Sequence, residues 1–551
     1  MFDNRITLLL VSCGVLIFSK LAAGQDSPVD PAGTHVFEAA VVDADSSEPL
    51  PVRVHIRGED GEWYHCESIG GEAVEYRREP EHLPHSFEVH TTLSPHPFRF
   101  RGSAGRYEIR IERGKEYIPL VRTIELGAEK LQPRVFRLQR WIDMSAAGWY
   151  SGDTHVHRKM DELPNAMLAE DLNVAFPLNY WVTHSGVLPA SSDRSVGGPA
   201  PPKLIKVDPT HVIWPRNTEY ELFFTNGKQH TQGAVFVLNH RSVLDLAAPP
   251  VGPIASRARQ ESALLDLDKH SWPWSLMIVP LMDVDLFELS NNHLWQTRFG
   301  FSEWTLDKAP EYMKLKLSPI GFTEESWTDF GFQTYYGLLN CGFPLRVSAG
   351  TASGVHPVQI GFGRVYVYLK EGFEYDAWID GLNAGRSFVT TGPMLQVTFN
   401  ESSAGRVFTG IEADEFSVRI QGRADSRRPL DRIEVVASGE VVASIDPQNR
   451  KTPVGAFESI IDETIVLKST GWVAVRCFED HPERRVRFAH TNPVFVKFSG
   501  SRLRPRRAEV QYFIDRIREE LARNRELLDE ASIAEYQKAL DVYLEIAKRA
   551  R

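Results

Sequence analysis

The sequence is organised around one short run of residues, Ser151-Gly152-Asp153-Thr154-His155-Val156-His157. The apolar residue between the two histidines favours an extended segment, and successive side chains of a strand point to opposite faces, so His155 and His157 share a face. Two imidazoles on one face can bind a single metal ion, and imidazole suits zinc, iron, manganese or nickel. Such a pair is equally typical of structural polar groups. The pattern downstream therefore has to decide between the two interpretations.

Strand-length apolar runs alternate with helical or loop segments from Trp149 to about Pro393, which indicates an α/β fold. Several of these runs end in polar residues. The polar endings are Asn179-Tyr180, Asn239-His240-Arg241, Ser290-Asn291-Asn292-His293 and Gly350-Thr351. Polar groups at the C-terminal ends of successive strands are typical of a (β/α) barrel with its site at that end. The sequence therefore predicts such a barrel over 148–400.

The flanking residues predict further domains in this 551-residue chain. Alternating runs predict an N-terminal β-sandwich over 35–140 and a C-terminal β domain over 401–500. Apolar residues at helical spacing predict a helical hairpin over 507–551. We expect its second helix to begin at the capping-box pattern Ser532-Ile533-Ala534-Glu535.

The N-terminus predicts an export signal over residues 1–24. Arg5 gives a positive start, 6–18 is apolar, and Ala22-Ala23-Gly24 offers a small-residue cleavage site. The apolar run is too short for a membrane span, so we expect a secreted or periplasmic protein.

The net charge and the cysteines argue against nucleic-acid binding, a disulfide framework and a cysteine-based metal site. A net charge of −11 argues against general nucleic-acid binding, which needs a basic face. Cys66, Cys341 and Cys477 are far apart and odd in number, which is typical neither of a disulfide framework nor of a cysteine-based metal site. No pattern indicates an oligomeric state.

Three stretches of this chain resemble a known family. Gly152-Asp153-Thr154-His155-Val156-His157 looks like the first motif of the PHP (polymerase and histidinol phosphatase) superfamily. Residues 340–351 and the run Ala384-Gly385-Arg386-Ser387-Phe388-Val389-Thr390-Thr391-Gly392-Pro393 resemble its carbaryl-hydrolase-like metallohydrolases. The resemblance covers about 148–400. It implies a distorted (β/α)7 barrel, a divalent metal cofactor (zinc, manganese or iron), and hydrolysis of amide, carbamate or phosphoester-type bonds through a metal-activated water.

The resemblance also implies a set of metal ligands. His155 and His157 match the first motif, and His240 matches the position of another metal-binding histidine. Glu288 looks like the strand carboxylate that bridges metals in the family, which makes it a candidate ligand and a candidate catalytic base.

Two positions depart from the family pattern. Asn179-Tyr180 stands in place of an Asp-His pair, and Ala352 stands in place of an Asp after Gly350-Thr351. The lost ligands predict about one bound ion per chain. His184, His293 and His356 lie near the gaps and are candidate substitutes, although each alone is more typical of a polar rim.

Asp153 and Arg241 complete the candidate catalytic residues. Asp153 follows Gly152, so it either orients a ligand imidazole or forms the turn. Arg241 and Asn291 follow strands where they either hold an anionic or carbonyl oxygen or form an ordinary polar surface. Aromatic residues crowd 270–336, which predicts core packing or a pocket wall for a flat or sugar-like substrate.

Competing functions follow from these patterns. The first is a secreted metal-dependent hydrolase that acts on a small-molecule or carbohydrate substrate. The second is a catalytically decayed barrel that binds extracellular carbohydrate. A structural component of an exported assembly is a third, which only the flanking domains favour.

Overall fold

A computed structural model describes residues 34–80, 83, 86–127, 131–195, 200–482 and 485–551. The predicted export signal at 1–24 lies outside these residues. The chain divides into two compact units. The first comprises Met1–Tyr76, Val89–Ile142 and Leu168–Glu170, and the second comprises Arg77–Glu88, Asp143–Met167 and Asp171–Arg551.

The first unit is built from two packed sheets. Its strands are β1 (His35–Asp43), β2 (Val52–Gly58), β3 (Trp63–Tyr64), β4 (Glu67–Ser68), β5 (Ala73–Arg78), β6 (Glu88–Leu93), β7 (Phe98–Gly102), β8 (Gly105–Glu112), β9 (Leu120–Leu126) and β10 (Arg134–Leu138). One sheet has the order β10-β1-β7-β4, and the other has the order β5-β6-β2-β8-β9 with β3 beside β2. Phe37 and Phe100 from the first sheet share a core with Ile56 and Ile109 from the second. Alternate residues of each strand therefore face this core.

The second unit holds three sheets. Its strands up to residue 390 are β11 (Trp149–Val156), β12 (Val174–Pro177), β13 (Tyr180–His184), β14 (Ile205–Lys206), β15 (Val212–Ile213), β16 (Thr218–Thr225), β17 (Lys228–Leu238), β18 (Leu264–Leu267), β19 (Leu286–Ser290), β20 (Arg346–Ala349), β21 (Arg364–Tyr368) and β22 (Ser387–Thr390). The later strands are β23 (Met394–Phe399), β24 (Val407–Ile411), β25 (Phe416–Ser426), β26 (Leu430–Ala437), β27 (Glu440–Ile445), β28 (Arg450–Lys451), β29 (Phe457–Leu467), β30 (Gly471–Glu479), β31 (Phe488–Thr491) and β32 (Val494–Phe498).

Strands of the predicted barrel region are divided between two of these sheets, so the fold is mixed α/β with several sheets. One sheet runs β13-β16-β17-β18-β19-β20, with β18, β19 and β20 parallel and β17 antiparallel to both neighbours. The widest sheet runs β14-β15-β12-β11-β21-β22-β31-β30-β26-β27, and β32 and β24 extend it from β30.

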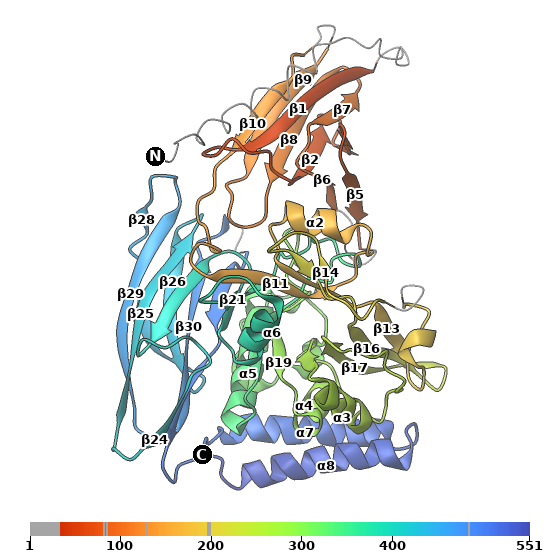
Figure 1. The fold of residues 1–551 in the computed structure, drawn as a ribbon. Coiled ribbons are helices and arrows are strands. Elements are labelled where there is room, and N and C mark those ends of the chain that lie inside the picture. The colour runs from red at the N-terminus through yellow and green to blue at the C-terminus, as the bar shows by residue number, and fades with distance from the viewer. Residues whose placement is uncertain (1–33, 81–82, 84–85, 128–130, 196–199, 483–484) are drawn as a thin grey trace, which may run out of the picture. The chain divides into compact units, whose positions relative to one another are not determined.

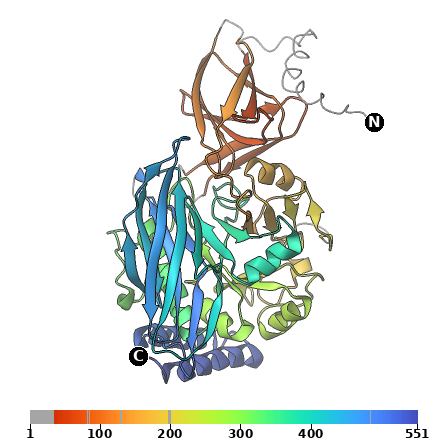
Figure 2. The same ribbon diagram turned by 60° about the vertical axis from the view of Figure 1, so that its left-hand side comes forward.

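The predicted C-terminal β domain shares a sheet with the residues before it. β22 pairs with β31 through Phe388 and Thr491, so strands from 401–500 continue the sheet that contains β11. The third sheet has the order β23-β25-β29-β28, and its long strands β25 and β29 run side by side in Figure 2.

Helices border these sheets (Figure 1). They are α2 (Leu163–Ala169), α3 (Gly252–Glu261), α4 (Ser275–Met282), α5 (Glu324–Cys341), α6 (Tyr375–Asn383), α7 (Arg507–Asn524) and α8 (Glu530–Ala547), with short 3-10 turns η1 (Pro189–Ser191), η2 (Leu306–Lys308) and η3 (Glu311–Met313). α5 begins with a capping box between Thr323 and Ser326, and it ends at Gly342, whose φ of 101° suits glycine. Among the described residues, no helix is long and apolar enough to cross a membrane.

The helical hairpin begins its second helix earlier than the sequence predicts. Asp529 caps α8 by accepting a hydrogen bond from the Ser532 amide, so the helix starts at Glu530. Glu535, expected in the capping box, instead accepts hydrogen bonds from the amides of Val251 and Gly252 at 2.8 and 2.7 Å. It therefore caps α3 and holds the hairpin against the α3–α4 region, which lies beside α7 and α8 in Figure 1.

Candidate metal centre

The two motif histidines lie at the C-terminal end of β11, and their rings turn toward a common point. β11 is hydrogen-bonded on both sides, to β12 and β21, which fixes the direction of each side chain. The Nε2 atoms of His155 and His157 lie 3.1 Å apart, while Val156 between them is fully buried. The alternation of strand side chains thus produces the paired imidazoles that the motif predicts.

Glu219 of β16 supplies a third ligand atom. Its carboxylate oxygens lie 3.2 Å from His157 Nε2 and 3.9 Å from His155 Nε2. A tetrahedral ion bound at about 2.0–2.1 Å holds its ligand atoms roughly 3.3 Å apart, so the separations of 3.1 Å between the two imidazoles and 3.2 Å between His157 and Glu219 match the spacing of a metal site. Glu219 is fully buried, and neither of its oxygens receives a hydrogen bond from any described residue. These residues therefore fit a divalent ion.

Carboxylates on the other side of His155 orient its ring. His155 Nδ1 lies 3.1 Å from Glu288 Oε2 and 3.7 Å from Asp268 Oδ1. The other Glu288 oxygen accepts a hydrogen bond from the Asn292 amide at 2.9 Å, which fixes the carboxylate. A histidine that donates Nδ1–H to a carboxylate presents Nε2 to a metal. Glu288 is therefore placed to orient His155.

Burial shifts the pKa values of both the histidines and the carboxylates of this site. Burial lowers the pKa of His157 to about 4 and that of His155 well below its usual value, so both rings are neutral, as metal ligands must be. Burial also raises the pKa of Glu219 and of Glu288, and it raises that of Glu221 to about 7 with help from the Glu219 charge. Carboxylates held this deep are stabilised by a bound cation.

Close packing against His155 and Glu288 requires a glycine at position 350, directly after β20. A Cβ atom at this position would lie 2.2 Å from His155 Cβ and 3.0 Å from Glu288 Cδ. Any side chain would therefore displace the two residues that approach each other here.

Asp153 acts on the backbone and not on an imidazole. Its carboxylate accepts hydrogen bonds from the His155 amide at 3.1 Å, the Thr351 hydroxyl at 2.6 Å and the Gly361 amide at 2.8 Å. It thereby fastens the end of β11 to the loop after β20. These contacts are those of the structural alternative that the sequence leaves open for Asp153.

His240 and Arg241 are not brought to this site. His240 Nδ1 lies 2.6 Å from the Ser242 carbonyl, and its Nε2 lies 2.9 Å from the Thr218 hydroxyl, so both ring nitrogens are engaged. Arg241 is exposed, and its amide donates to Glu261. That His240 is a metal ligand and Arg241 is catalytic stays a prediction: the Thr218 hydroxyl lies at His240 Nε2, and neither residue lines the cavity beside His155 and His157.

The departures from the family pattern also have structural explanations. The Asn179 side-chain amide donates to the Pro215 carbonyl at 2.7 Å, and the Tyr180 hydroxyl accepts from the Ala200 amide at 3.0 Å. Both residues stabilise loops. Ala352 lines the cavity described next, and its methyl group offers no ligand atom.

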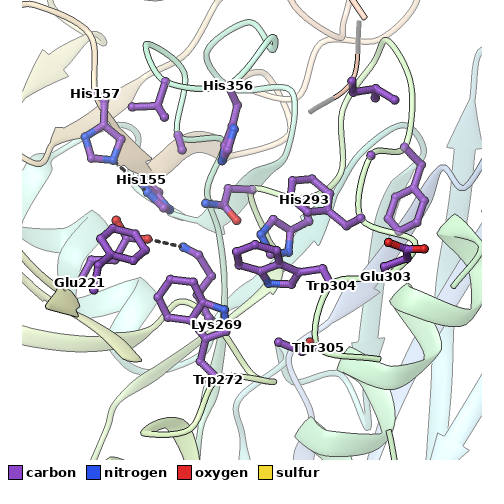
Figure 3. Close-up of a pocket in the computed structure, with 18 of the residues that line it drawn as sticks. His155, His157, Glu221, Lys269, Trp272, His293, Glu303, Trp304, Thr305 and His356 are labelled. Carbon is purple, nitrogen blue, oxygen red and sulfur yellow. Dashed lines mark hydrogen bonds and ion pairs between the residues drawn. The ribbon is translucent and has the colours of Figure 1, made fainter. Parts of the chain in front are cut away.

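A cavity of about 1070 Å³ opens beside the histidines (Figure 3). Its wall carries His155, His157, Trp181, Arg194, Glu221, Phe223, Lys269, Trp272, His293, Phe301, Trp304, Ala352 and His356, among others. The predicted aromatic stretch divides in two. Trp272 and Trp304 line the cavity with ring centroids 5.9 Å apart, whereas Trp274, Trp295 and Trp327 are buried in the core.

Four charged residues of the site were not predicted from the sequence: Glu219, Glu221, Asp268 and Lys269. Glu219 and Glu221 alternate with apolar residues on β16, so one face of that strand carries both. Asp268 and Lys269 directly follow β18. Two charged residues on one face of a strand, and two more at a strand end, were the signals that could have identified them.

Comparison with known proteins gives no assignment. No family model matches this chain, and no curated protein matches it. Two crystal structures of Parabacteroides merdae β-glucuronidase, one with glycerol in its active site, are similar at 9% identity and a TM-score of 0.16. The alignments cover 85% of this chain and 66% and 64% of those chains. At that TM-score they carry no inference about fold or function.

Proposed function

We propose that this protein is a secreted metal-dependent hydrolase that cleaves amide, carbamate or phosphoester-type bonds. In this proposal 148–400 corresponds to a distorted (β/α) barrel of the PHP type. One divalent ion is held by His155, His157 and Glu219. The observation that carries the proposal is the convergence of one ligand atom from each of these three residues, within 4.8 Å of one another, beside a large cavity whose wall carries His155 and His157.

The ligand set suits this chemistry. Two imidazoles and one carboxylate make a three-ligand site that leaves a coordination position open, as catalytic zinc sites do. Such an ion, when bound, supplies Lewis-acid chemistry by lowering the pKa of a coordinated water and polarising the scissile oxygen.

The protein's own residues position the reactants. Glu288 orients His155 through Nδ1, and Asp153 fixes the backbone on which His155 lies. Glu221 borders the cavity, where Trp181 Nε1 donates to its Oε2 at 3.0 Å and Lys269 Nζ lies 3.4 Å from its Oε1, so the carboxylate is fixed beside the histidines as the group that accepts a proton from an attacking water. Trp272 and Trp304 bind the apolar part of the substrate and exclude water from it.

Metal analysis combined with turnover tests the proposal. The purified protein is expected to contain about one zinc, manganese or iron per chain and to hydrolyse at least one member of a panel of anilides, aryl carbamates and phosphoesters. Chelation should abolish turnover, and added metal should restore it. Replacing both His155 and His157 by Ala should remove both the ion and the activity.

His184→Ala is the matched control. This ring stacks on Phe224 at 4.5 Å and does not line the cavity, so the variant should keep both the ion and the activity. Turnover that survives complete metal removal would contradict the proposal, as would native protein that binds no ion.

The aromatic wall favours a second candidate, a carbohydrate-binding protein without catalysis. Indole rings such as those of Trp272 and Trp304 offer apolar faces on which a sugar ring can pack. Glycan binding that persists in chelator, with no turnover of any substrate, would support this candidate over the hydrolase.

A further inference from the structure

Lys269 lies inside the carboxylate cluster beside the proposed ion. Its Nζ contacts Asp268 Oδ2 and lies 3.4 Å from Glu221 Oε1. The side chain is 4% exposed, and the ammonium lies 5.2 Å from the centre of the Trp272 ring. Figure 3 shows it directed toward Glu221 on the same side of the cavity as His155 and His157. A buried ammonium so placed is fixed in position by its partners.

The same carboxylates form a second potential cation site. Oxygens of Glu219, Glu221 and Asp268 lie within 4.8 Å of one another, and all three residues are buried. Glu219 also belongs to the group formed with His155 and His157, so an ion at each place would share its carboxylate. The Lys269 ammonium already contacts two of the three carboxylates at the second place.

The charges of the cluster indicate that the ammonium and a second divalent ion compete for the same place. Four carboxylates belong to the groups at this centre that could hold a cation: Glu219, Glu221, Asp268 and Glu288. One divalent ion and the ammonium supply three positive charges against these four. A second divalent ion in addition would bring like charges together at a buried site, whereas a second ion in place of the ammonium would balance the four carboxylates.

We propose that the ammonium of Lys269 takes the place of a second divalent ion, so that the centre binds one metal ion. The inference rests on the proposed function for the first ion. It assigns Lys269 a positioning role, since it holds Asp268 against Nδ1 of His155 and Glu221 at the cavity wall. Removal of the ammonium opens the second place to a metal.

Manganese stoichiometry and electron paramagnetic resonance test this assignment. Native protein, dialysed against excess Mn²⁺, should bind one ion per chain and give the six-line spectrum of an isolated ion. Lys269→Met, similar in length but neutral, should bind two ions per chain and give an exchange-coupled spectrum. Lys269→Gln should do the same, and Lys269→Arg should keep one ion.

Lys228→Met is the matched control, because Lys228 is exposed at the start of β17 and should leave the stoichiometry at one. A single ion in folded Lys269→Met and Lys269→Gln would overturn the inference. So would an exchange-coupled spectrum from native protein, whether or not the variants fold.

The outcomes separate this inference from the proposed function. Native protein that binds two ions and hydrolyses a substrate overturns the role of Lys269 alone. Native protein that binds one ion, gains a second on Lys269→Met, and hydrolyses nothing supports the role of Lys269 and contradicts the hydrolase. Native protein that binds no ion overturns both.

Discussion

Glu219→Gln tests the metal centre against the ligand set that sequence alone implies. The glutamine has the same shape but lacks the charge, and Glu219 provides one of three converging ligand atoms. A four-ligand zinc site is worth about 10–16 kcal/mol, so one ligand is worth roughly 2.5–4 kcal/mol, or about 10²–10³-fold in affinity. His240→Gln is the opposing variant. It should leave metal affinity unchanged, because His240 bonds to Ser242 and Thr218.

Thermal melts with and without Zn²⁺ measure the difference. At a free ion concentration one hundred times Kd, binding stabilises the native protein by about 2.7 kcal/mol. A Glu219→Gln affinity weaker by 10²–10³-fold leaves about 0.4 kcal/mol or less of that gain. His240→Gln should keep the whole metal-dependent gain while losing overall stability, since two buried hydrogen bonds are broken at a cost of about 1–3 kcal/mol.

Without metal, the Glu219→Gln variant should be more stable than the native protein, although it gains less stability from Zn²⁺. Burial raises the pKa of this carboxyl in the folded state, so the charge destabilises the fold increasingly as pH rises above the usual value. Metal-free Glu219→Gln should therefore melt higher than metal-free native protein at pH 8 and equally at pH 4. A Zn²⁺ response that is lost in His240→Gln and kept in Glu219→Gln would refute the reasoning.

Further predictions concern the packing around the site. Gly350→Ala should lower metal affinity and should lower Tm through a loss of about 1–3 kcal/mol of stability, because the added methyl group would meet His155. Gly331→Ala in α5 is the control, since this position has room for a methyl group and the change should not destabilise the protein. Thermal melts of both variants check the difference. Burial lowers the pKa of His211, but two neighbouring carboxylates outweigh burial and raise that pKa above its usual value. The contribution of His211 to folding stability is therefore complete below about pH 6.5 and is lost as pH rises. His211→Gln should lower Tm more at pH 5.5 than at pH 8.5. Glu535→Gln should cost about 0.5–2 kcal/mol by weakening the cap of α3, measured by urea unfolding.

Local periodicity was sufficient to identify two of the three residues that converge at the candidate metal centre. The spacing of His155 and His157 fixes their common face on any strand, so the paired Nε2 atoms follow from the sequence. Glu288 is likewise found at its strand and close to His155, although it contacts Nδ1. The mixed α/β character also follows from the alternation of apolar runs.

Long-range pairing decided the rest. His240 follows a strand, as the resemblance implies, but the Thr218 hydroxyl and the Ser242 carbonyl bind its ring, and neither contact is visible in the sequence. Glu219 enters the site because β16 pairs between β13 and β17. Residues 401–500 read as a separate domain because local patterns do not reveal that β31 pairs with β22.

The same chain shows how it buries carboxylates that serve only structure. In the first unit Glu112 is buried, yet Arg53 and Arg110 both contact it. Burial alone would raise the pKa of Glu112, but these two charges hold it well below its usual value. Glu219, equally buried, has no arginine and no hydrogen-bond donor among the described residues, and its pKa is raised. The fold gives one buried carboxylate two arginine partners, and gives the other neutral imidazoles in contact and the Lys269 charge beyond contact distance. The second carboxylate is therefore left with a charge that a metal ion is suited to balance.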